Sequence, residues 1–354
     1  MAYTTIDDPG LFFTAFLYPG AAGAFVAHTG VGFQPDWTWH KSRTSTGWHG
    51  VADVVRGVDA DPGCKALYAN SNSAEESNTT EYLDGYQSDG FKTGENGSFG
   101  APSNNYVAWC WKANGSGSAN TAGSINTTKT SANTTSGISI NTFSGTGSNA
   151  TIGHGLGVAP TVILCKNRAS GSDNWNWNNF SISSLGNTGR IYFNEADGNS
   201  AAAAAWNSTA PTSTLVSLGS NGENNGSSML LYAFAPIQGF SKFGSYIGNG
   251  NADGTFVYTG FRPAWVMYKR IDGSGSWYIH DTKRNTYNPA NSQLIAQEPD
   301  AEATGSSYDM DILSNGFKMR NTGGERNGSG NVISYMAFAE QPFVNSEGVP
   351  CNAR

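Results

Sequence analysis

The stretch FRPAWVMYKR (residues 261–270) is the third of three related stretches in this chain, after FQPDWTWHKSR (33–43) and VAPTVILCKNR (158–168). In each stretch a proline precedes a lysine by six residues, and the residues between them are mostly apolar. Apolar side chains on both faces of a short run indicate a central β-strand that is covered on both sides. We therefore take these stretches as equivalent strands of three repeats.

Each repeat also closes on a similar run: YVAWCW (106–111), MLLYAF (229–234) and ISYMAF (333–338). The distance from the lysine to the last aromatic residue is 70, 68 and 69 residues in the three repeats. A pattern that keeps both ends in register defines one structural unit copied three times. Each unit has roughly a hundred residues, which is enough to bury a core.

The composition favours strands and turns over helices. Of the 354 residues, 45 are glycine and only 13% are charged, whereas aromatic residues reach 12%. Glycine and small polar residues form helices poorly and turns well, and the aromatic content is too high for a disordered chain. The prediction is an all-β protein of three tandem β-sandwich (jelly-roll-like) domains, each with two antiparallel sheets around a Trp-rich core.

The repeats suggest four segments. Residues 1–113 form an N-terminal segment plus the first β-sandwich, and residues 114–137, almost wholly Gly, Ser, Asn, Thr and Ala, are expected to be a flexible linker. The second β-sandwich is expected over 138–237, and the third, with a C-terminal tail, over 238–354. The opening residues 3–17 are expected either to dock onto a partner subunit or to form an edge strand of the first repeat.

Charge and cysteine spacing exclude several classes of function. A net charge of −7 disfavours nucleic acid as a partner. No apolar run reaches the roughly 18–20 residues needed to cross a bilayer, so we expect no membrane insertion. The acidic N-terminus lacks the features of a secretory signal. No metal site and no cofactor are expected, because no zinc-ligand spacing joins the cysteines Cys64, Cys110, Cys165 and Cys351.

Several polar residues recur at matching places and are interpreted as structural repeat positions: Lys41, Asp53, Arg56, Lys166, Lys269, Asp281 and Arg284. The Asp53/Arg56 and Asp281/Arg284 pairs are expected to be structural salt bridges, and Glu75 and Glu302 also correspond. Counting from the lysine places Asn178 and Ser181 of repeat two at the Asp and Arg positions. Trp48 and Trp277 are also matched, because each follows the basic pair of its repeat.

The basic residues at the ends of the opening runs have two interpretations. They could touch an acidic glycan, but we expect their head groups to extend into water at the strand ends.

No catalytic constellation emerges, and we expect no enzymatic activity. There is no GxSxG elbow, and the five histidines lie scattered over the three repeats, where surface or strand-end positions are expected. A metal site formed by His28, His40 and His49 is the less favoured alternative. Acidic residues that could serve glycoside hydrolysis recur between repeats, which favours a structural role over catalysis.

The most ligand-like residues are Trp175, Asn176, Trp177 and Tyr278. An exposed Trp or Tyr beside Asn can hold a sugar by ring stacking and hydrogen bonds. Alternatively Trp175 and Trp177, two residues apart on a strand, share one buried face. Both interpretations stand at this point.

Four phrases carry a resemblance to a known group of proteins: YTTIDDP (3–9), YVAWCWKA (106–113), GTGSNATIGHGLG (145–157) and GFSKFGSY (239–246). The chain resembles the repeat-bearing virion structural (tail fibre-like) proteins of marine bacteriophages, particularly cyanophages. The resemblance covers nearly the whole chain and implies a virion component that is assembled in the host cytoplasm. It supplies no catalytic residues.

These observations lead to three functional expectations. The first is a tail fibre or tail-tip component that engages the host surface through loops on a rigid scaffold. The second is a capsid decoration or head-fibre protein that stabilises the shell, in which three like domains imitate a trimer. The third and least favoured is a glycan depolymerase. Expected partners are other virion proteins of tail or capsid, with the chain present in multiple copies, and a glycan or protein of the host surface.

Overall fold

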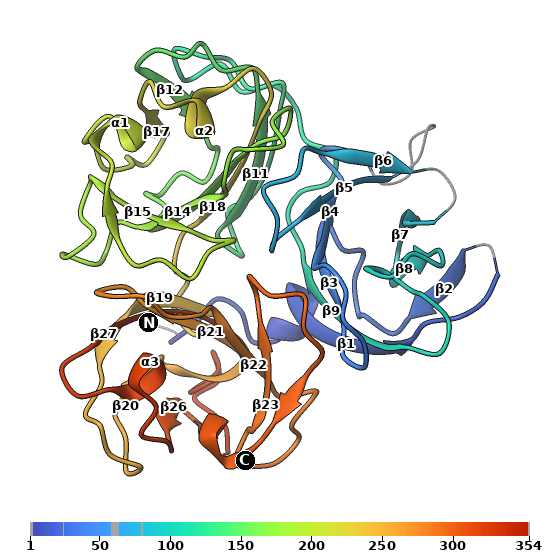
Figure 1. The fold of residues 1–354 in the computed structure, drawn as a ribbon, viewed down its shortest axis with the longest axis vertical. Helices are drawn as coiled ribbons and strands as arrows, with labels where there is room; N and C mark the ends of the chain where they lie inside the picture. The colour runs from blue at the N-terminus through green and yellow to red at the C-terminus, as the bar shows by residue number, and fades with distance from the viewer. Residues whose placement is uncertain (1–2, 24, 58–63, 79–80, 353–354) are drawn as a thin grey trace.

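The computed structural model describes residues 3–23, 25–57, 64–78 and 81–352. Strands make up 41% and helices 5% of the chain, and all sheets are antiparallel. Three β-sandwich units are arranged around a common centre (Figure 1), which confirms the predicted fold class. We call them unit 1 (β1 to β9), unit 2 (β10 to β18) and unit 3 (β19 to β27).

Unit 1 has a six-stranded inner sheet in the order β1-β9-β3-β4-β5-β6 and a three-stranded outer sheet in the order β2-β8-β7. A 3₁₀ turn, η1, precedes its first strand. The bounds are η1 Pro9–Leu11, β1 Phe13–Pro19, β2 Val26–Thr29, β3 Trp37–Ser42, β4 Gly50–Asp53, β5 Cys64–Tyr68, β6 Glu76–Asn78, β7 Leu83–Gln87, β8 Gly90–Thr93 and β9 Asn105–Trp111.

Unit 2 has a seven-stranded inner sheet in the order β10-β11-β18-β13-β14-β15-β16, and the pair β12-β17 covers it. The bounds are β10 Lys129–Asn133, β11 Ile138–Phe143, β12 Ala150–Gly153, β13 Val162–Asn167, β14 Asn176–Asn179, β15 Gly189–Tyr192, β16 Ser200–Ala201, α1 Ala203–Trp206, β17 Leu215–Leu218, α2 Gly222–Asn225 and β18 Met229–Phe234.

Unit 3 repeats the plan of unit 1, with inner sheet β19-β27-β21-β22-β23-β24 and outer sheet β20-β26-β25. The bounds are β19 Ser241–Ile247, β20 Phe256–Tyr258, β21 Phe261–Arg270, β22 Tyr278–Asp281, β23 Ser292–Ile295, β24 Ala303–Thr304, η2 Ser306–Tyr308, β25 Met310–Leu313, β26 Gly316–Met319, α3 Gly324–Asn327 and β27 Val332–Pro342.

The two runs that define each repeat are neighbouring strands. β3 pairs with β9, β13 with β18 and β21 with β27, and the lysines lie opposite equivalent partners: Lys41 opposite Val107, Lys166 opposite Leu230 and Lys269 opposite Ser334. The constant spacing in the sequence therefore measures the chain length between two adjacent central strands.

The Trp-rich core lies between the units and not inside each sandwich. Eight of the ten tryptophans belong to one cluster that includes residues of all three inner sheets: Trp37, Trp39, Trp109, Trp111, Trp175, Trp177, Trp265 and Trp277. Alternate residues of the same strands face the other way; Ala108 and Cys110 pack in the sandwich of unit 1. Each inner sheet is thus covered on one face by its own outer strands and on the other by its two neighbours, which corrects the expected location of the core.

The three units follow one another around a pseudo-threefold axis. The same backbone hydrogen bond joins neighbours at each contact: Arg168 O accepts from Glu75 N at 2.8 Å, Arg43 O from Glu302 N at 2.9 Å, and Ile271 O from Asn199 N at 2.8 Å. We call these contacts seam 1/2, seam 3/1 and seam 2/3. The ring is closed within one chain.

Residues 114–137 are more than a linker, contrary to expectation. They contain β10, which pairs with β11 at the edge of the unit 2 sheet. The Asn133 side chain donates to Ala113 O at 2.9 Å, and the Ser131 hydroxyl accepts from Asn114 N at the same distance. Small polar residues that suit a linker suit this hydrogen-bonded edge equally well.

The N-terminal segment takes one of its two expected roles, the edge strand, and it also contacts another unit of the same chain. β1 is an edge strand of the unit 1 sheet. The residues before it reach unit 3, where the Tyr3 hydroxyl donates to Gly260 O at 2.8 Å and the Thr4 hydroxyl to Gln238 O at 2.9 Å. The first residues of the chain thus fasten unit 1 to unit 3.

Candidate functional site

Seam 1/2 contains a relay of four charged side chains, of which Asp53 and Arg56 are fully buried. Asp53 bonds Arg56 at 2.5 Å, Arg56 bonds Glu75 at 3.2 Å, and Glu75 accepts from Arg168 of unit 2 at 2.6 Å. Burial alone would raise the pKa of Glu75, but the hydrogen bond from Arg168 and the charge of Arg56 hold that pKa below its usual value. The Glu75 carboxylate therefore stays ionised and joins the two units.

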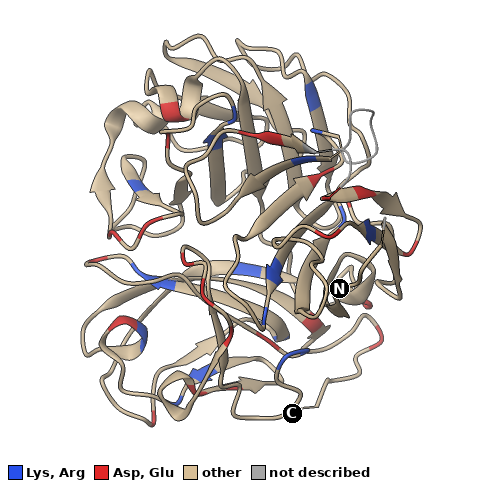
Figure 2. Ribbon diagram, turned by 45° about the vertical axis from the view of Figure 1, so that its right-hand side comes forward, with Lys and Arg blue, Asp and Glu red and all other residues tan. Residues whose placement is uncertain are grey.

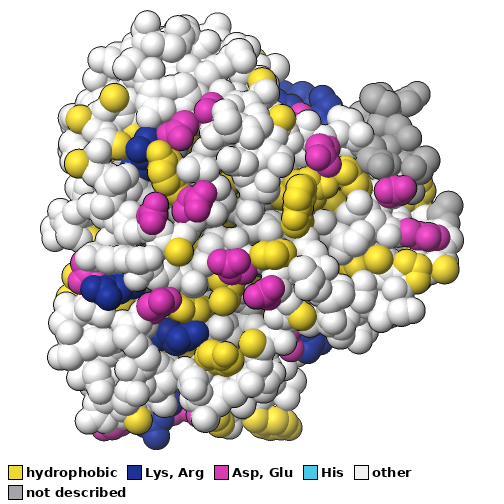
Figure 3. Space-filling model, viewed as in Figure 1, with side chains coloured by type: hydrophobic (Ala, Val, Ile, Leu, Met, Phe, Trp, Pro, Cys, Tyr) yellow, Lys and Arg dark blue, Asp and Glu magenta, His cyan; other side chains and the backbone are white. Residues whose placement is uncertain are grey.

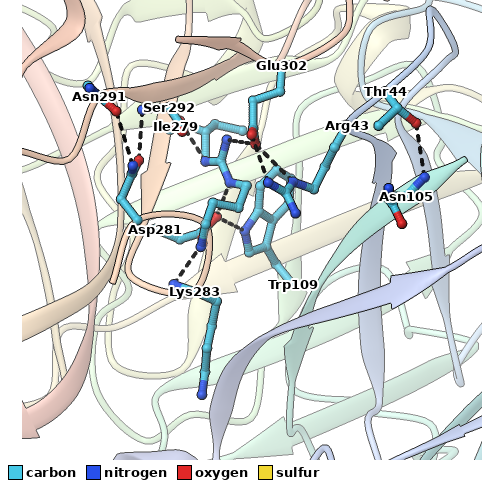
Figure 4. Close-up of polar contacts among 12 residues, drawn as sticks. Arg43, Thr44, Asn105, Trp109, Ile279, Asp281, Lys283, Asn291, Ser292 and Glu302 are labelled. Atoms are coloured by element: carbon cyan, nitrogen blue, oxygen red, sulfur yellow. Dashed lines mark hydrogen bonds and ion pairs between the residues drawn. The ribbon is translucent and has the colours of Figure 1, made fainter. Parts of the chain in front are cut away.

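Seam 3/1 repeats this relay with the same geometry, and Figure 4 shows it in close-up. Asp281 bonds Arg284 at 2.5 Å, Arg284 bonds Glu302 at 3.1 Å, and Glu302 accepts from Arg43 of unit 1 at 2.9 Å. The expected Asp–Arg salt bridges are present in both units. Their continuation across the seam to Arg43 and Arg168 was not anticipated, because two arginines that follow a lysine by two residues give no sign of their partners.

A fifth residue completes each relay from the neighbouring unit. Tyr232 of unit 2 donates through its hydroxyl to Asp53 at 2.7 Å, and Trp109 of unit 1 donates through its indole N–H to Asp281 at 3.0 Å. Tyr232 and Trp109 occupy the same place in β18 and β9. Each buried carboxylate is thus bonded by its own unit and by the next one.

Seam 2/3 has lost the relay at every position. Strand register places Asn179 opposite Val162, as Asp53 lies opposite Trp37, and Ile182 follows it by three residues, as Arg56 follows Asp53. Asn199 stands in place of the relay glutamate, and Ile271 in place of the arginine that crosses the seam. Met336 stands in place of the Tyr or Trp donor. Both acids have become asparagine and both arginines isoleucine, so charge is removed in balanced pairs.

This register corrects the assignment of Asn178 and Ser181 as the Asp and Arg counterparts. The loop after Lys166 is one residue longer than its equivalents, so counting from the lysine slips by one. A shared hydrogen bond shows that Trp175 and Trp277 correspond to His49 and not to Trp48. In all three units the backbone N–H of this residue donates to a side-chain amide oxygen, at 2.8 to 2.9 Å.

An open groove lies where the relay is missing. It has a volume of about 570 Å³ and is lined by Ser184, residues 197–200 of unit 2 and residues 271–274 of unit 3. Asn199 and Ile271, which replace the cross-seam Glu and Arg, are both in its wall. Figure 3 shows charged side chains along the lines where the three lobes meet, and Figure 2 shows that charges of both signs lie close together on the ribbon.

The repeated lysines are interior residues, contrary to the expectation that they extend into water. Lys41, Lys166 and Lys269 are fully buried, and burial lowers the pKa of each to about 8. Two of them bond carbonyls across a seam, Lys166 to Asn72 O at 3.1 Å and Lys269 to Glu195 O at 3.3 Å. They are structural groups that close the ring.

The predicted sugar-binding residues are also in the interior. Trp175, Asn176, Trp177 and Tyr278 are at most 4% exposed. The indole of Trp175 donates to Tyr68 O of unit 1 at 3.0 Å. Stacking on a ligand needs an open ring face, so these residues cannot serve as such a surface; the alternative of a shared buried face describes Trp175 and Trp177.

The histidines are buried, which corrects their expected position at the surface. His40, His49, His154 and His280 are fully enclosed and His28 is 7% exposed. Across the part of the chain that the structure describes, no group of three or more His, Cys, Asp or Glu side chains has the arrangement of a metal site. Among the same residues, no helix is long and apolar enough to cross a membrane.

Exposed aromatic residues lie elsewhere: Trp48 on unit 1 is 43% exposed, and the others are on unit 3. Phe256 and Tyr258 of β20 are 44% and 47% exposed and point to the same side of the outer sheet. The Lys242 ammonium lies 5.0 Å from the centre of the Tyr258 ring. The equivalent strand of unit 1 has Ala27 and Thr29 at these places, so this surface distinguishes unit 3.

Comparison with known proteins gives a family but no function. No curated protein and no solved structure matches the chain. One family model matches residues 8–342, and its description is a domain of unknown function, DUF7483. The match spans all three units of this chain. The chain belongs to the DUF7483 family.

Proposed function

We propose that this protein is a structural component of a bacteriophage virion, a tail fibre or tail-tip protein that engages the host surface and has no enzymatic activity. The observation that carries the proposal is the contrast between the seams. Two seams are closed by ion relays, and the third presents an open groove on the same rigid scaffold. Recognition sites are commonly placed on irregular segments that a rigid framework holds.

The resemblance to tail fibre-like proteins of marine phages supports the same assignment. A virion protein must keep its shape outside the cell, and a ring closed through one shared core is suited to that demand. Expected partners are other virion proteins, with several copies in each particle, and a glycan or protein of the host surface. Assembly takes place in the host cytoplasm.

The second candidate is capsid decoration, and the pseudo-threefold ring favours it. A single chain with three like units can sit on a threefold axis of a shell, with each unit facing an equivalent subunit. The two candidates differ in where the protein lies on the particle.

Immunogold electron microscopy of intact virions, with antibody raised against the recombinant chain, separates the two. Gold at the fibres or the tail tip is the expected result. Gold distributed over the head would reject host engagement and establish shell decoration in its place. Pre-immune serum and a phage that lacks the gene serve as controls.

A further inference from the structure

We infer that the groove of seam 2/3 is a binding site for a neutral saccharide. This inference rests on the proposed function, because it names the class of host-surface ligand and the place where that ligand binds. The starting point is that the groove occupies the position at which the other seams hold an ion pair, so the space is a consequence of specific replacements at Asn199 and Ile271.

The lining suits a ligand with many hydroxyl groups. It presents the hydroxyls of Ser184, Ser200 and Ser274 and the carboxylates of Asp197 and Asp272. Carboxylates accept from sugar hydroxyls, and the Ser184 hydroxyl can donate and accept. The hydroxyls of Ser200 and Ser274 already donate to Arg190 O and Ala196 O and can still accept. The volume of about 570 Å³ lies within the range of small-molecule sites, about 300–1,000 Å³.

The walls of the groove are fixed before any ligand binds. Asp272 accepts from Arg270 Nε at 2.8 Å and from Val332 N at 3.0 Å. The Asn199 side chain bonds Arg190 N and Ser184 O, both at 3.2 Å. A fixed site loses little conformational entropy on binding, which favours affinity.

A glycine allows the two walls to approach each other. A Cβ atom on Gly198 would lie 2.7 Å from Gly273 O of unit 3, which is too close for a real contact. The other seams have Ala74 and Ala301 at this place. The 272–274 turn of unit 3 can therefore come nearer to unit 2 than its counterparts do at their seams.

The charges of the groove select against other ligands. Among the described residues that line it, none is Lys or Arg, and the charge of buried Lys269 acts on the Asp197 carboxylate from outside the lining. Uronic or sialic acids would meet the Asp197 carboxylate in a lining that contains no cationic side chain. A basic peptide is less suited, because the glutamate that holds a guanidinium at the other seams is Asn199 here and Asp272 is already paired with Arg270.

The test uses the purified full chain and a panel of methyl glycosides of glucose, galactose and mannose, with N-acetylglucosamine, measured by saturation-transfer NMR and titration. Glucuronic acid and an Arg-containing peptide are the charged probes. We expect at least one neutral sugar to bind, and Asp197→Ser to weaken it by about tenfold, the loss of a charge-assisted hydrogen bond.

A second variant fills the groove. Asn199→Glu with Ile271→Arg installs the ion pair of the other seams, and sugar binding should be lost. The matched control, Glu75→Asn with Arg168→Ile, removes that pair from seam 1/2 and should bind sugar as the unaltered chain does. Circular dichroism confirms the fold of each variant, and Asp197→Ser, at an exposed position, serves if either double variant fails to fold.

Other outcomes overturn the inference in distinguishable ways. Sugar binding that survives both Asp197→Ser and the filled groove places the saccharide site elsewhere. Binding of the Arg peptide alone would replace the saccharide with a basic partner. Binding of no sugar, combined with gold at the tail tip, rejects this inference and leaves the proposed function standing, whereas gold on the head rejects the proposed function whatever the sugar result.

Discussion

The hydroxyl of Tyr232 in unit 2 lies 2.7 Å from the carboxylate of Asp53 in unit 1, and both side chains are buried. Asp53 also accepts from Arg56 within its own unit. A carboxylate in the interior is tolerated only when its lone pairs are satisfied. The fold of unit 1 is thus completed by a side chain that unit 2 supplies.

Replacement of Tyr232 by Phe should therefore destabilise the whole ring. The expected loss in the free energy of unfolding is about 1–3 kcal/mol, because the buried Asp53 carboxylate loses one of its hydrogen-bond donors. Urea denaturation measures it. Tyr287→Phe, at a site that is 81% exposed, is the control and should change stability little. Equal stability of the two variants would show that Asp53 does not need the donor.

The charged relay makes a graded prediction. Arg56, with no exposed side-chain surface, should be the most costly arginine to replace by Met, at about 3–5 kcal/mol, because its loss leaves Asp53 unpaired in the interior. Arg168→Met should cost less, since its side chain is 15% exposed and Glu75 keeps Arg56.

Lys92→Met is the surface comparison for this series. Its pair with Asp84 is 3.5 Å long, and the two side chains are 35% and 45% exposed, so the pair should contribute less than about 1 kcal/mol. The order Arg56, Arg168, Lys92 in urea denaturation is the expected result. A loss for Lys92 as large as that for Arg56 would contradict the assignment of the relay as an interior lock.

The shared core predicts that the three units unfold together. A single unit would expose the inner face of its sheet, which in unit 1 carries Trp37, Trp39, Trp109 and Trp111. Calorimetry should give one transition, and tryptophan fluorescence and far-UV circular dichroism should coincide through it. Fluorescence reports mainly the central cluster, so a fluorescence change that precedes the loss of strand signal would show that the units separate first.

Sequence reasoning anticipated the fold because register is a long-range constraint. Lys41 and Trp111 lie on adjacent strands, and their counterparts keep nearly the same separation in the other units, so spacing alone defined the repeat. Apolar residues on both faces of these strands indicated two covering layers, but periodicity does not say what provides a layer. Neighbouring units provide one of the two covering layers. The tryptophans therefore lie in one shared core and not in three separate cores.

The candidate site was less accessible to sequence reasoning. The groove depends on the identities of Asn199 and Ile271, and neither attracts notice alone; only their alignment with Glu75 and Arg168 gives them meaning. That alignment fails by counting, because the loop before Trp175 has one extra residue. Ala74 and Glu75, matched with Ala301 and Glu302, were the available signal, and Gly198 and Asn199 are the missing third copy.

The five histidines predict sensitivity to mild acid. Burial lowers the pKa of His28 to about 4 and of His40 and His280 to about 3, and it lowers the pKa of His49 and His154 as well. In the unfolded chain these rings take up protons near pH 6.5. As the pH falls from 7.5 to 5.5, the unfolded state gains protons that the folded state does not bind, so the free energy of unfolding must fall.

Each ring contributes up to about 1.4 kcal/mol per pH unit once the unfolded form is protonated. Urea denaturation at pH 7.5, 6.5 and 5.5 measures the slope in a range where most carboxylates stay ionised in both states. His280→Gln removes one titrating group, so its slope should be smaller even if its stability at pH 7.5 is reduced. A free energy of unfolding that is constant over this range would mean that the rings reach water in the folded protein, which would contradict the closed packing at both faces of the inner sheets.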